Sequence, residues 1–236
     1  MTTLPLALIG MGRMGRALEQ LAPDRGFRVV ATIHHEHAIT KESLNGAAVA
    51  IEFTTPAAAA ANVLACASVG CPVVVGTTGW YEQLPTVRRI VEQSRGALLT
   101  APNFSVGVAI FERIVAEAAR LFADQPFFDS HMIETHHTAK KDAPSGTAAS
   151  LARAAEAASA KPMPITSVRV GSVPGTHEVL FDGAFEQVRL VHEARDRRVF
   201  AEGALAAARW LVGRTGVFTM QDVLAPPHAT PHTTTR

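Results

Sequence analysis

The sequence predicts an α/β protein with two domains: an N-terminal doubly wound parallel sheet and a second α+β domain with a mixed sheet. Two observations carry this prediction. Short apolar runs alternate with helical stretches over residues 1–104, at the interval typical of parallel βαβ units. Further on, three strand-like runs follow one another with only turns between them, which favours a mixed sheet. A chain of 236 residues is long enough for two such domains.

A glycine loop follows the first predicted strand. Leu4–Ile9 is a short apolar run that we expect to be a buried strand, and Met14–Leu21 is expected to be a helix. In a G-x-G-x-x-G loop the first glycine permits a tight turn, the second lets a pyrophosphate approach the backbone, and the third lets the helix pack on the strand. The flanking elements favour a dinucleotide site over a turn that binds nothing. The candidate cofactor-binding residues here are Gly10, Met11, Gly12, Arg13, Met14 and Gly15.

The second predicted strand, Phe27–Ile33, ends at a pair of histidines. The residue at its end normally contacts the adenosine ribose, and an acid there favours NAD. This chain has His34 at that position, with Glu36 just beyond. Histidine tolerates the extra phosphate of NADP, while Glu36 can still reach a ribose hydroxyl. We therefore expect both NADH and NADPH to be used, with His34 among the cofactor-binding residues.

The next three predicted strands end in loops of small and polar residues. These strands are Val49–Phe53, Pro72–Val75 and Ala97–Leu99, with helices expected over Ala57–Ser68 and Tyr81–Ser94. In doubly wound sheets ligands bind beyond the carboxyl ends of the strands, where these loops fall. Small residues permit close approach, and Thr and Asn supply hydrogen bonds. The loops add seven candidate cofactor-binding residues: Gly76, Thr77, Thr78, Ala101, Pro102, Asn103 and Phe104.

A change of pattern near Phe104 marks the predicted domain boundary. Residues 1–104 are expected to form the dinucleotide-binding domain and residues 105–213 the second domain. Apolar residues recur with a helical period in the first element after the boundary. The elements expected from there on are helix Ser105–Phe122, strand Phe127–Glu134, helix Ala148–Ala160, strands Ile165–Val173, Glu178–Phe181 and Val188–His192, and helix Phe200–Val212.

The stretch Glu134–Ala148 places charged residues directly before a Pro-Ser-Gly-Thr turn and an alanine-rich helix. It contains two adjacent histidines, His136 and His137, and the cations Lys140 and Lys141. Backbone N–H groups at a helix N-terminus, together with the helix dipole, favour a carboxylate or phosphate. A histidine exchanges protons near neutral pH, because its unperturbed pKa is about 6.5. The stretch therefore predicts a receptor for a small dianion whose chemistry needs a proton.

The pattern E-x-H-H-x-x-K-x-D-x-P-S-G-T-A over this stretch resembles the signature of the 4-hydroxy-tetrahydrodipicolinate reductase family of diaminopimelate and lysine biosynthesis. The loops at residues 76–78 and 101–104 also resemble that family. The resemblance implies a Rossmann-type first domain, completed by the C-terminal segment 214–236, and a second domain for substrate binding and oligomerisation. It also implies a homotetramer and hydride transfer from NADH or NADPH to a cyclic dicarboxylate.

The resemblance also implies roles within the signature. His136 is expected to be the general acid and Lys140 the second donor, which stabilises the anion that develops. A substrate carboxylate is expected at the turn and the adjacent helix N-terminus. The residues expected to bind the substrate are His137, Ser145, Gly146 and Thr147. His177 is expected to have a structural role.

Composition excludes several other functions. A net charge of +1 with 18% charged residues gives no field for nucleic acid or a membrane surface. No signal segment or membrane-spanning run is evident, so we expect a soluble cytoplasmic protein with Cys66 and Cys71 reduced. No metal site is expected, because the histidine spacing lacks the usual ligand patterns. Residues 225–236, rich in Pro, Thr and His, are expected to form a mobile tail.

Two competing functions come from other classes. One is another two-domain NAD(P)-dependent dehydrogenase of amino-acid metabolism, whose catalytic motif would lack the combination of histidine pair, lysine and P-S-G-T turn. The other is a non-catalytic nicotinamide sensor, which would keep the glycine loop but need no proton donor. The presence of His136 and Lys140 argues against the sensor.

Overall fold

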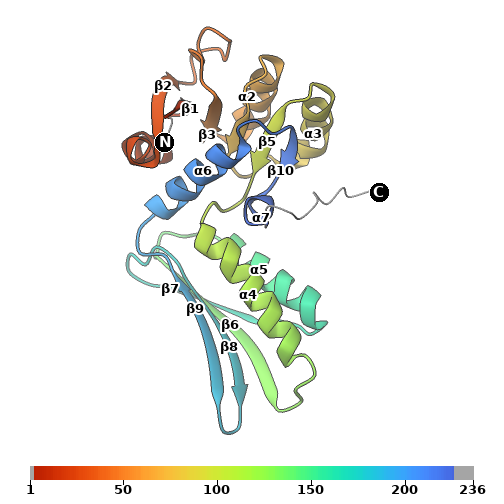
Figure 1. Ribbon diagram of the computed structural model, residues 1–236. Coiled ribbons are helices and arrows are strands. Elements are labelled where there is room, and N and C mark those ends of the chain that lie inside the picture. The colour runs from red at the N-terminus through yellow and green to blue at the C-terminus, as the bar shows by residue number, and fades with distance from the viewer. Residues whose placement is uncertain (1–2, 226–236) are drawn as a thin grey trace. The chain divides into compact units, whose positions relative to one another are not determined.

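The computed structural model describes residues 3–225, and the chain divides into two compact units (Figure 1). One unit comprises the chain up to Phe104 and again from Phe200 onward, and the other comprises Ser105–Val199. The division between Val199 and Phe200 falls in the first turn of helix α6 (Arg198–Leu211), whereas the sequence placed the return to the first unit after residue 213. The reason is that α6 packs within the first unit. A Cβ on Gly203 would overlap the carbonyl oxygen of Phe104, so the helix and that backbone are in direct contact.

The first unit contains a six-stranded sheet, sheet A, in which every strand pairs in parallel with its neighbours. The strand order is β10-β5-β4-β3-β1-β2, and the order reverses next to β1, so the carboxyl ends of β1 and β3 flank a switch point where ligands bind in such sheets. The prediction of a doubly wound parallel sheet is confirmed. Its strands are β1 (Leu4–Ile9), β2 (Phe27–Ile33), β3 (Val49–Glu52), β4 (Val73–Val75), β5 (Ala97–Thr100) and β10 (Gly216–Phe218).

The helices of the first unit connect these strands along the chain or, in the case of α7, follow the last of them. They are α1 (Arg13–Leu21), α2 (Pro56–Ser68), α3 (Leu84–Gln93), α6, and α7 (Met220–Val223). Pro56 is the first residue of α2, where its missing N–H removes no helical hydrogen bond. Side chains of α2 and α3 form one core with the central strands, and both Cys66 and Cys71 are free and buried in it, as expected. Strands β3, β4 and β5 are buried along their whole length, which is typical of a parallel sheet with covered faces.

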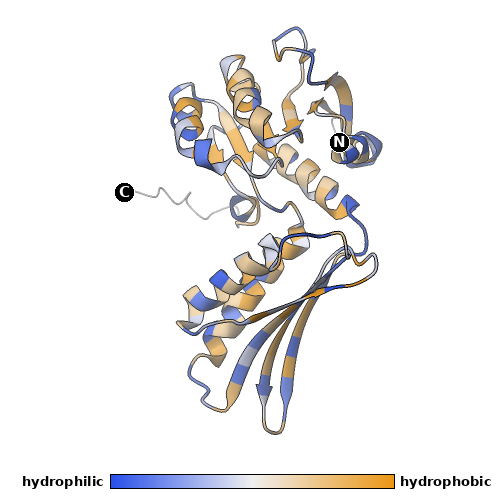
Figure 2. Cartoon of the chain, turned by 180° about the vertical axis from the view of Figure 1, so that it is seen from behind, coloured by the Kyte–Doolittle hydropathy of each residue, from blue (hydrophilic) through white to orange (hydrophobic). Residues whose placement is uncertain are grey.

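The second unit contains a mixed four-stranded sheet, sheet B, in the order β7-β6-β8-β9. Strand β6 pairs in parallel with β7 and antiparallel with β8, so the predicted mixed sheet is also confirmed. The strands alternate hydrophobic and hydrophilic residues, unlike those of sheet A (Figure 2), because only one face is covered by helices. The elements are α4 (Val106–Phe122), β6 (Phe128–His136), α5 (Gly146–Ser159), β7 (Ile165–Arg169), β8 (Thr176–Gly183) and β9 (Gln187–Glu193).

Element boundaries differ from the expected ones mainly near the signature. Strand β6 extends through His136, and α5 begins at Gly146 because the Ser145 side chain caps it. The helix expected for Tyr81–Ser94 begins as a 3₁₀ turn and becomes α-helical only at Leu84. The predicted tail lies outside the described residues from position 226 onward. Within residues 3–225, no helix combines the length and apolar character that crossing a bilayer requires.

Candidate active site

The glycine loop of the first unit has the geometry that a dinucleotide needs. Gly10 has a φ of +90°, and a Cβ on it would overlap the carbonyl oxygen of Phe53. A Cβ on Gly15 would overlap the carbonyl oxygen of Gly10, so helix and strand pack closely there. At Gly12, by contrast, a Cβ would meet nothing within 4 Å in the described chain. The loop is therefore tight on the protein side and open in front of the N-terminus of α1, which fits a pyrophosphate.

The other candidate cofactor residues follow the neighbouring strands of sheet A. Gly76 follows β4, and the ring of Phe53 occupies the space that a side chain at Gly76 would need. Thr77 is buried, its hydroxyl accepts a hydrogen bond from the backbone of Thr54 at 2.7 Å, and Thr78 is exposed. Residues 101–104 follow β5, with Ala101 and Phe104 buried. His34 is exposed directly after β2. Met11, Arg13 and Met14 lie at the start of α1 or just before it.

Next to these loops lies Glu52, a residue that was not predicted to be functional from the sequence. It ends β3, is fully buried, and accepts hydrogen bonds from the hydroxyl of Thr54 and, at 3.2 Å, from the amide of Asn62. Its second oxygen has no hydrogen-bond partner among the described residues. Burial raises the pKa of Glu52, although these neutral donors oppose the shift. The surroundings therefore shift Glu52 toward its neutral form, relative to a carboxyl group in water.

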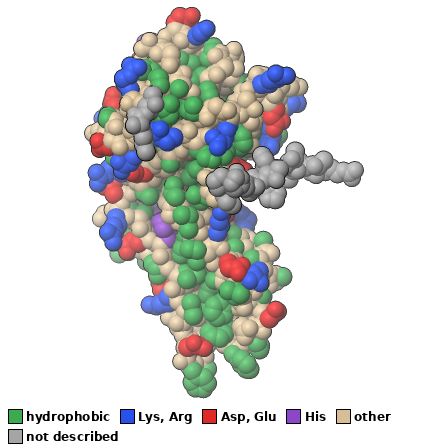
Figure 3. All heavy atoms as spheres, in the orientation of Figure 1, with side chains coloured by type: hydrophobic (Ala, Val, Ile, Leu, Met, Phe, Trp, Pro, Cys, Tyr) green, Lys and Arg blue, Asp and Glu red, His purple; other side chains and the backbone are tan. Residues whose placement is uncertain are grey.

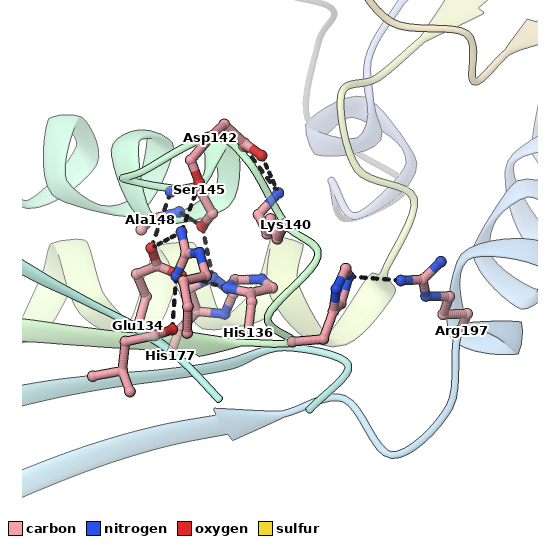
Figure 4. Close-up of polar contacts among 11 residues, drawn as sticks. Glu134, His136, Lys140, Asp142, Ser145, Ala148, His177 and Arg197 are labelled. Atoms are coloured by element: carbon pink, nitrogen blue, oxygen red, sulfur yellow. Dashed lines mark hydrogen bonds and ion pairs between the residues drawn. The ribbon is translucent and has the colours of Figure 1, made fainter. Parts of the chain in front are cut away.

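In the second unit the signature residues meet around Glu134 (Figure 4). Glu134 is fully buried on β6, and one of its carboxylate oxygens is paired with Nδ1 of His136. Its other oxygen accepts from the Arg169 guanidinium at 2.7 Å and from the backbone N–H of Ser145 at 3.3 Å. His136 is 8% exposed, and a Cβ on Gly175 would lie 3.0 Å from its Nε2. The ring is thus held at Nδ1, and its second nitrogen lies beside a residue without a side chain.

The charges of this cluster shift the pKa values of both Glu134 and His136. Burial would raise the pKa of Glu134, but hydrogen bonds from Arg169, Ser167 and His136 outweigh it and lower the pKa to about 2. Burial lowers the pKa of His136, while the Glu134 carboxylate opposes that shift. Glu134 is therefore an anion across the physiological range, and it supports the protonated form of His136 that burial disfavours.

Lys140 lies in the loop after β6, paired with Asp142. Their Nζ and carboxylate oxygens are 2.8 Å apart, and this contact lowers the pKa of Asp142. The backbone carbonyl of Asp142 also accepts a hydrogen bond of 2.6 Å from Arg169. Arg169 therefore joins the loop that carries Lys140 to the strand that carries His136.

The Pro-Ser-Gly-Thr turn forms the N-terminus of α5. Ser145 is the N-cap, since its hydroxyl accepts from the backbone of Ala148 at 3.1 Å. Ser145 is only 1% exposed, and its hydroxyl also lies 3.3 Å from Nε2 of His177. Beside Gly146, by contrast, the described chain leaves open space where a Cβ would be. Thr147 is half-buried. The exposed face of the helix N-terminus is thus at Gly146, where an anion has access.

Three residues of the cluster were not predicted to be functional from the sequence. Arg169 and Arg197 had no assigned role, and His177 was expected to be structural. Arg169 reaches it from β7 and His177 from β8, while Arg197 donates to Nε2 of His137 at 2.8 Å. The parallel register pairs His136 with Arg169, and the antiparallel register pairs Glu134 with His177. Sequence spacing gave no signal for the contacts of Arg169 and His177, because they depend on strand pairing, nor for that of Arg197, which is 60 residues from His137 in the chain. Among residues 3–225, no group of three or more His, Cys, Asp or Glu side chains is arranged to hold a metal ion.

Comparisons with known families match both parts of the chain. The family model described as "Dihydrodipicolinate reductase, N-terminus" matches residues 4–104, and "Dihydrodipicolinate reductase, C-terminus" matches residues 107–224. The 4-hydroxy-tetrahydrodipicolinate reductase of Christiangramia forsetii is 35% identical, over 93% of this chain and 97% of the relative. That of Methanoculleus marisnigri is 42% identical over 75% of each chain.

Solved structures share the fold. The dipicolinate-bound dihydrodipicolinate reductase from Paenisporosarcina sp. TG-14 has a TM-score of 0.78 at 22% identity, covering 92% of this chain and 98% of that one. The DAP dehydrogenase of C. glutamicum, solved in complex with DAP, has a TM-score of 0.57 at 14% identity, covering 96% and 97%. At these identities the likeness concerns the two-unit fold.

Proposed function

The chain belongs to the dihydrodipicolinate reductase family, and from this premise we propose that it reduces 4-hydroxy-tetrahydrodipicolinate to tetrahydrodipicolinate with NADH or NADPH, in diaminopimelate and lysine biosynthesis. Curated relatives that cover most of the chain are named for this reaction. The observation that carries the proposal to this chain is the cluster around Glu134. It holds a proton donor, a cation and an anion-binding helix N-terminus in one unit.

The reaction needs a loss of water, a hydride and a proton. The reduced nicotinamide supplies the hydride, and the protein must protonate the enamine-like site that the hydride creates. His136 is the general acid, acting through Nε2 because Nδ1 is paired with Glu134. Burial lowers the pKa of His136 in the free protein. A doubly negative ligand nearby raises it again and so loads the proton when substrate is bound. Lys140 stabilises the anion that develops.

The substrate carboxylates bind at the turn and at His137. The open space beside Gly146 supports a carboxylate on the first amides of α5, with Thr147 adding a hydroxyl. Ser145 caps the helix and holds the turn in shape. The guanidinium of Arg197 donates to Nε2 of His137, so Nδ1 is the ring nitrogen that carries the hydrogen a carboxylate accepts.

The reduced dinucleotide binds in the first unit. The open side of Gly12 and the N-terminus of α1 receive the pyrophosphate, and the loops after β4 and β5 contact the nicotinamide and its ribose. These loops contribute Gly76, Thr77, Thr78, Ala101, Pro102, Asn103 and Phe104. Exposed His34, not an acid, is the first residue after β2, and Glu36 lies two residues beyond it. That position supports the use of both cofactors.

The chain assembles as a homotetramer through the uncovered face of sheet B. Hydrophobic side chains gather around the β8–β9 turn (Figure 3), where Phe127 and Phe185 are 83% and 101% exposed. Val168 and Val191 are also exposed on strands of this sheet. Exposed apolar groups on a sheet face that no helix covers are typical of an interface. Sedimentation velocity of the wild type and Phe185→Ser tests this assembly, and a monomeric wild type contradicts it. We place the enzyme in the cytoplasm, which the two free, buried cysteines support.

The activity is tested by following NADPH oxidation at its absorbance, with and without freshly generated 4-hydroxy-tetrahydrodipicolinate. We expect oxidation that depends on the substrate and is inhibited by dipicolinate. The same assay with other amino-acid-derived substrates separates this function from a related dehydrogenase. Tight NADPH binding without any turnover would instead indicate a sensor.

A further inference from the structure

Arg169 occupies a central position among the signature residues, although it lies outside the signature. It ends β7, and its Nη2 atom donates to the Glu134 carboxylate at 2.7 Å and to the backbone carbonyl of Asp142 at 2.6 Å. Its Nη1 atom donates to the carbonyl of Val168 at 2.8 Å. The side chain is 18% exposed, and its Nε is buried without a partner among the described residues. The guanidinium is therefore fixed by contacts on two different segments.

Each of those contacts leads to one of the two proton-handling residues. Glu134 is paired with Nδ1 of His136, so the first contact bears on the orientation of that ring. Asp142 is paired through its side chain with Lys140 at 2.8 Å, so the second contact bears on the position of that ammonium. A single guanidinium nitrogen thus connects the strand that holds the imidazole to the loop that holds the lysine.

The charge of Arg169 also decides where the cluster keeps its proton. A buried carboxylate without a cation binds a proton more strongly, and Glu134 would then compete with His136 for it. With Arg169 in place, the pKa of Glu134 is about 2, although burial alone would raise it. The other charged or titratable groups near His136 are Lys140, which lowers its pKa, and His177, whose own pKa burial lowers to about 4. The pKa values of Glu134 and His177 thus lie well below 7, so neither residue competes with His136 for a proton near neutral pH.

We propose that Arg169 is a positioning residue of the reaction: it holds Glu134 as an anion against His136 and fixes the loop that carries Lys140, so that both donors face the substrate together. This inference rests on the proposed function and adds a residue to it. Arg169 itself touches neither the reacting atoms nor the cofactor. Its effect reaches them through Glu134 and Asp142.

The test compares four variants of the full chain saturated with NADPH. Arg169→Met removes the charge and keeps the stem. Arg169→Lys keeps a charge on a flexible stem, without the rigid planar guanidinium that holds Nη2 against both acceptors. The double variant Arg169→Met/Glu134→Gln removes both buried charges. It leaves no unpaired buried carboxylate, so it keeps the test available if Arg169→Met alone does not fold. Arg120→Met is the matched control, since Arg120 makes two hydrogen bonds, of 2.8 and 2.7 Å, to Glu117 on the exposed side of α4.

We expect Arg169→Met to lower kcat about a hundredfold, because small displacements of catalytic groups have effects of that size. NADPH affinity should stay within about threefold of wild type. In the pH profile of kcat, activity should fall at acid pH, because Glu134 now takes up a proton there. This fall is the acid limb of the profile. Arg169→Lys should lower kcat without that acid limb, and the double variant should also lack it. Arg120→Met should match the wild type.

Several results would overturn the inference. One is a wild-type kcat and pH profile in Arg169→Met. Another is a parallel fall of kcat, NADPH affinity and melting temperature with no new acid limb, which is the signature of a purely structural residue. An acid limb that persists in the double variant would show that Glu134 is not its source. The proposed function fails separately, if His136→Gln and Lys140→Ala both keep wild-type turnover.

Discussion

Two buried glutamates, one in each unit, have opposite electrostatics. Glu52 ends β3 of sheet A and Glu134 lies near the end of β6 in sheet B, and neither is exposed to solvent. Glu52 is surrounded by hydroxyls and an amide, and burial raises its pKa. Glu134 faces a guanidinium and an imidazole, and its pKa falls to about 2. Burial alone therefore does not decide the charge of a carboxylate; the charge of its partners does.

The same difference separates the two binding regions. The first unit offers its ligand backbone amides and open space, and its glycines matter because they have no side chain. The second unit offers fixed charges, held by ion pairs between strands and loops. A reduced dinucleotide needs a surface that fits its shape, whereas the reduction of a dicarboxylate needs charge and a proton at defined atoms. Four predictions test this contrast, beginning with the largest expected effect.

Loss of a proposed proton donor in the second unit should abolish most turnover and leave the first unit unaffected. His136→Gln or Lys140→Ala should lower kcat by roughly 100- to 10,000-fold, as the loss of general-acid catalysis does. NADPH affinity, measured by fluorescence titration, should be unchanged. Near wild-type turnover in either variant would remove that residue from its role.

Neutralising the two glutamates should change stability in opposite directions. For Glu134 the folded pKa lies below the unfolded value of about 4.5, so its ionisation stabilises the fold above pH 4.5 and this stabilisation is lost as pH falls toward 2. Glu134→Gln should therefore destabilise the protein at pH 7, by roughly 3 kcal/mol.

For Glu52 the pKa in the folded state is raised. Its contribution to the free energy of unfolding is therefore fully present below pH 4.5 and is lost as pH rises through the folded pKa. Glu52→Gln should consequently leave stability at pH 7 unchanged or higher. Urea unfolding at pH 4, 5.5 and 7 measures both variants. Equal losses at pH 7 would contradict the comparison.

Two glycines of the first unit should separate ligand binding from stability. Gly15→Ala places a Cβ against the Gly10 carbonyl and should destabilise the unit by about 1–3 kcal/mol through overpacking. Gly12→Ala meets nothing in the described chain, so it should leave the melting temperature unchanged. It should nevertheless weaken NADPH binding about tenfold, because the new methyl group lies where the pyrophosphate approaches. Equal effects of the two substitutions on melting would refute this.

The smallest effect is expected for the choice of cofactor. Exposed His34 stands at the end of β2, where an acid that would repel the 2′-phosphate of NADP is usual, and Glu36 lies two residues beyond it. Steady-state kinetics should therefore find both cofactors in use. A difference in kcat/KM above about a hundredfold, roughly 2.7 kcal/mol, would contradict the interpretation.

Most of the fold could be predicted from local patterns. The strands of sheet A up to β5 are apolar runs bounded by turns, and the glycine spacing identifies the first loop together with the strand before it and the helix after it. Strand β10 has three residues, too few for a periodic signal, and within residues 3–225 it pairs only with β5. Helix α6 could not be placed in the first unit, because its amphipathic pattern does not say which surface it covers.

The candidate site was predictable only where its residues are close in sequence. His136, Lys140 and the Ser145 turn lie in one segment, so a motif reveals them. Arg169 and His177 join them through the register of two strand pairs, and no pattern in a single segment encodes a register. Glu52 looked like the end of an apolar strand, and only its neighbours explain how a carboxylate is accommodated there.

The order of strands has a consequence for synthesis. Sheet A is completed by residues 216–218, whose strand extends the edge formed by β5, and Gly216 donates its N–H to the carbonyl of Gly96 at 2.8 Å. On the ribosome, that edge emerges long before its last partner, with all of Ser105–Val199 translated in between. The second unit can thus fold while sheet A of the first unit still lacks β10, which pairs with β5. Adding that strand requires a contact of high sequence separation, which places this step late in folding.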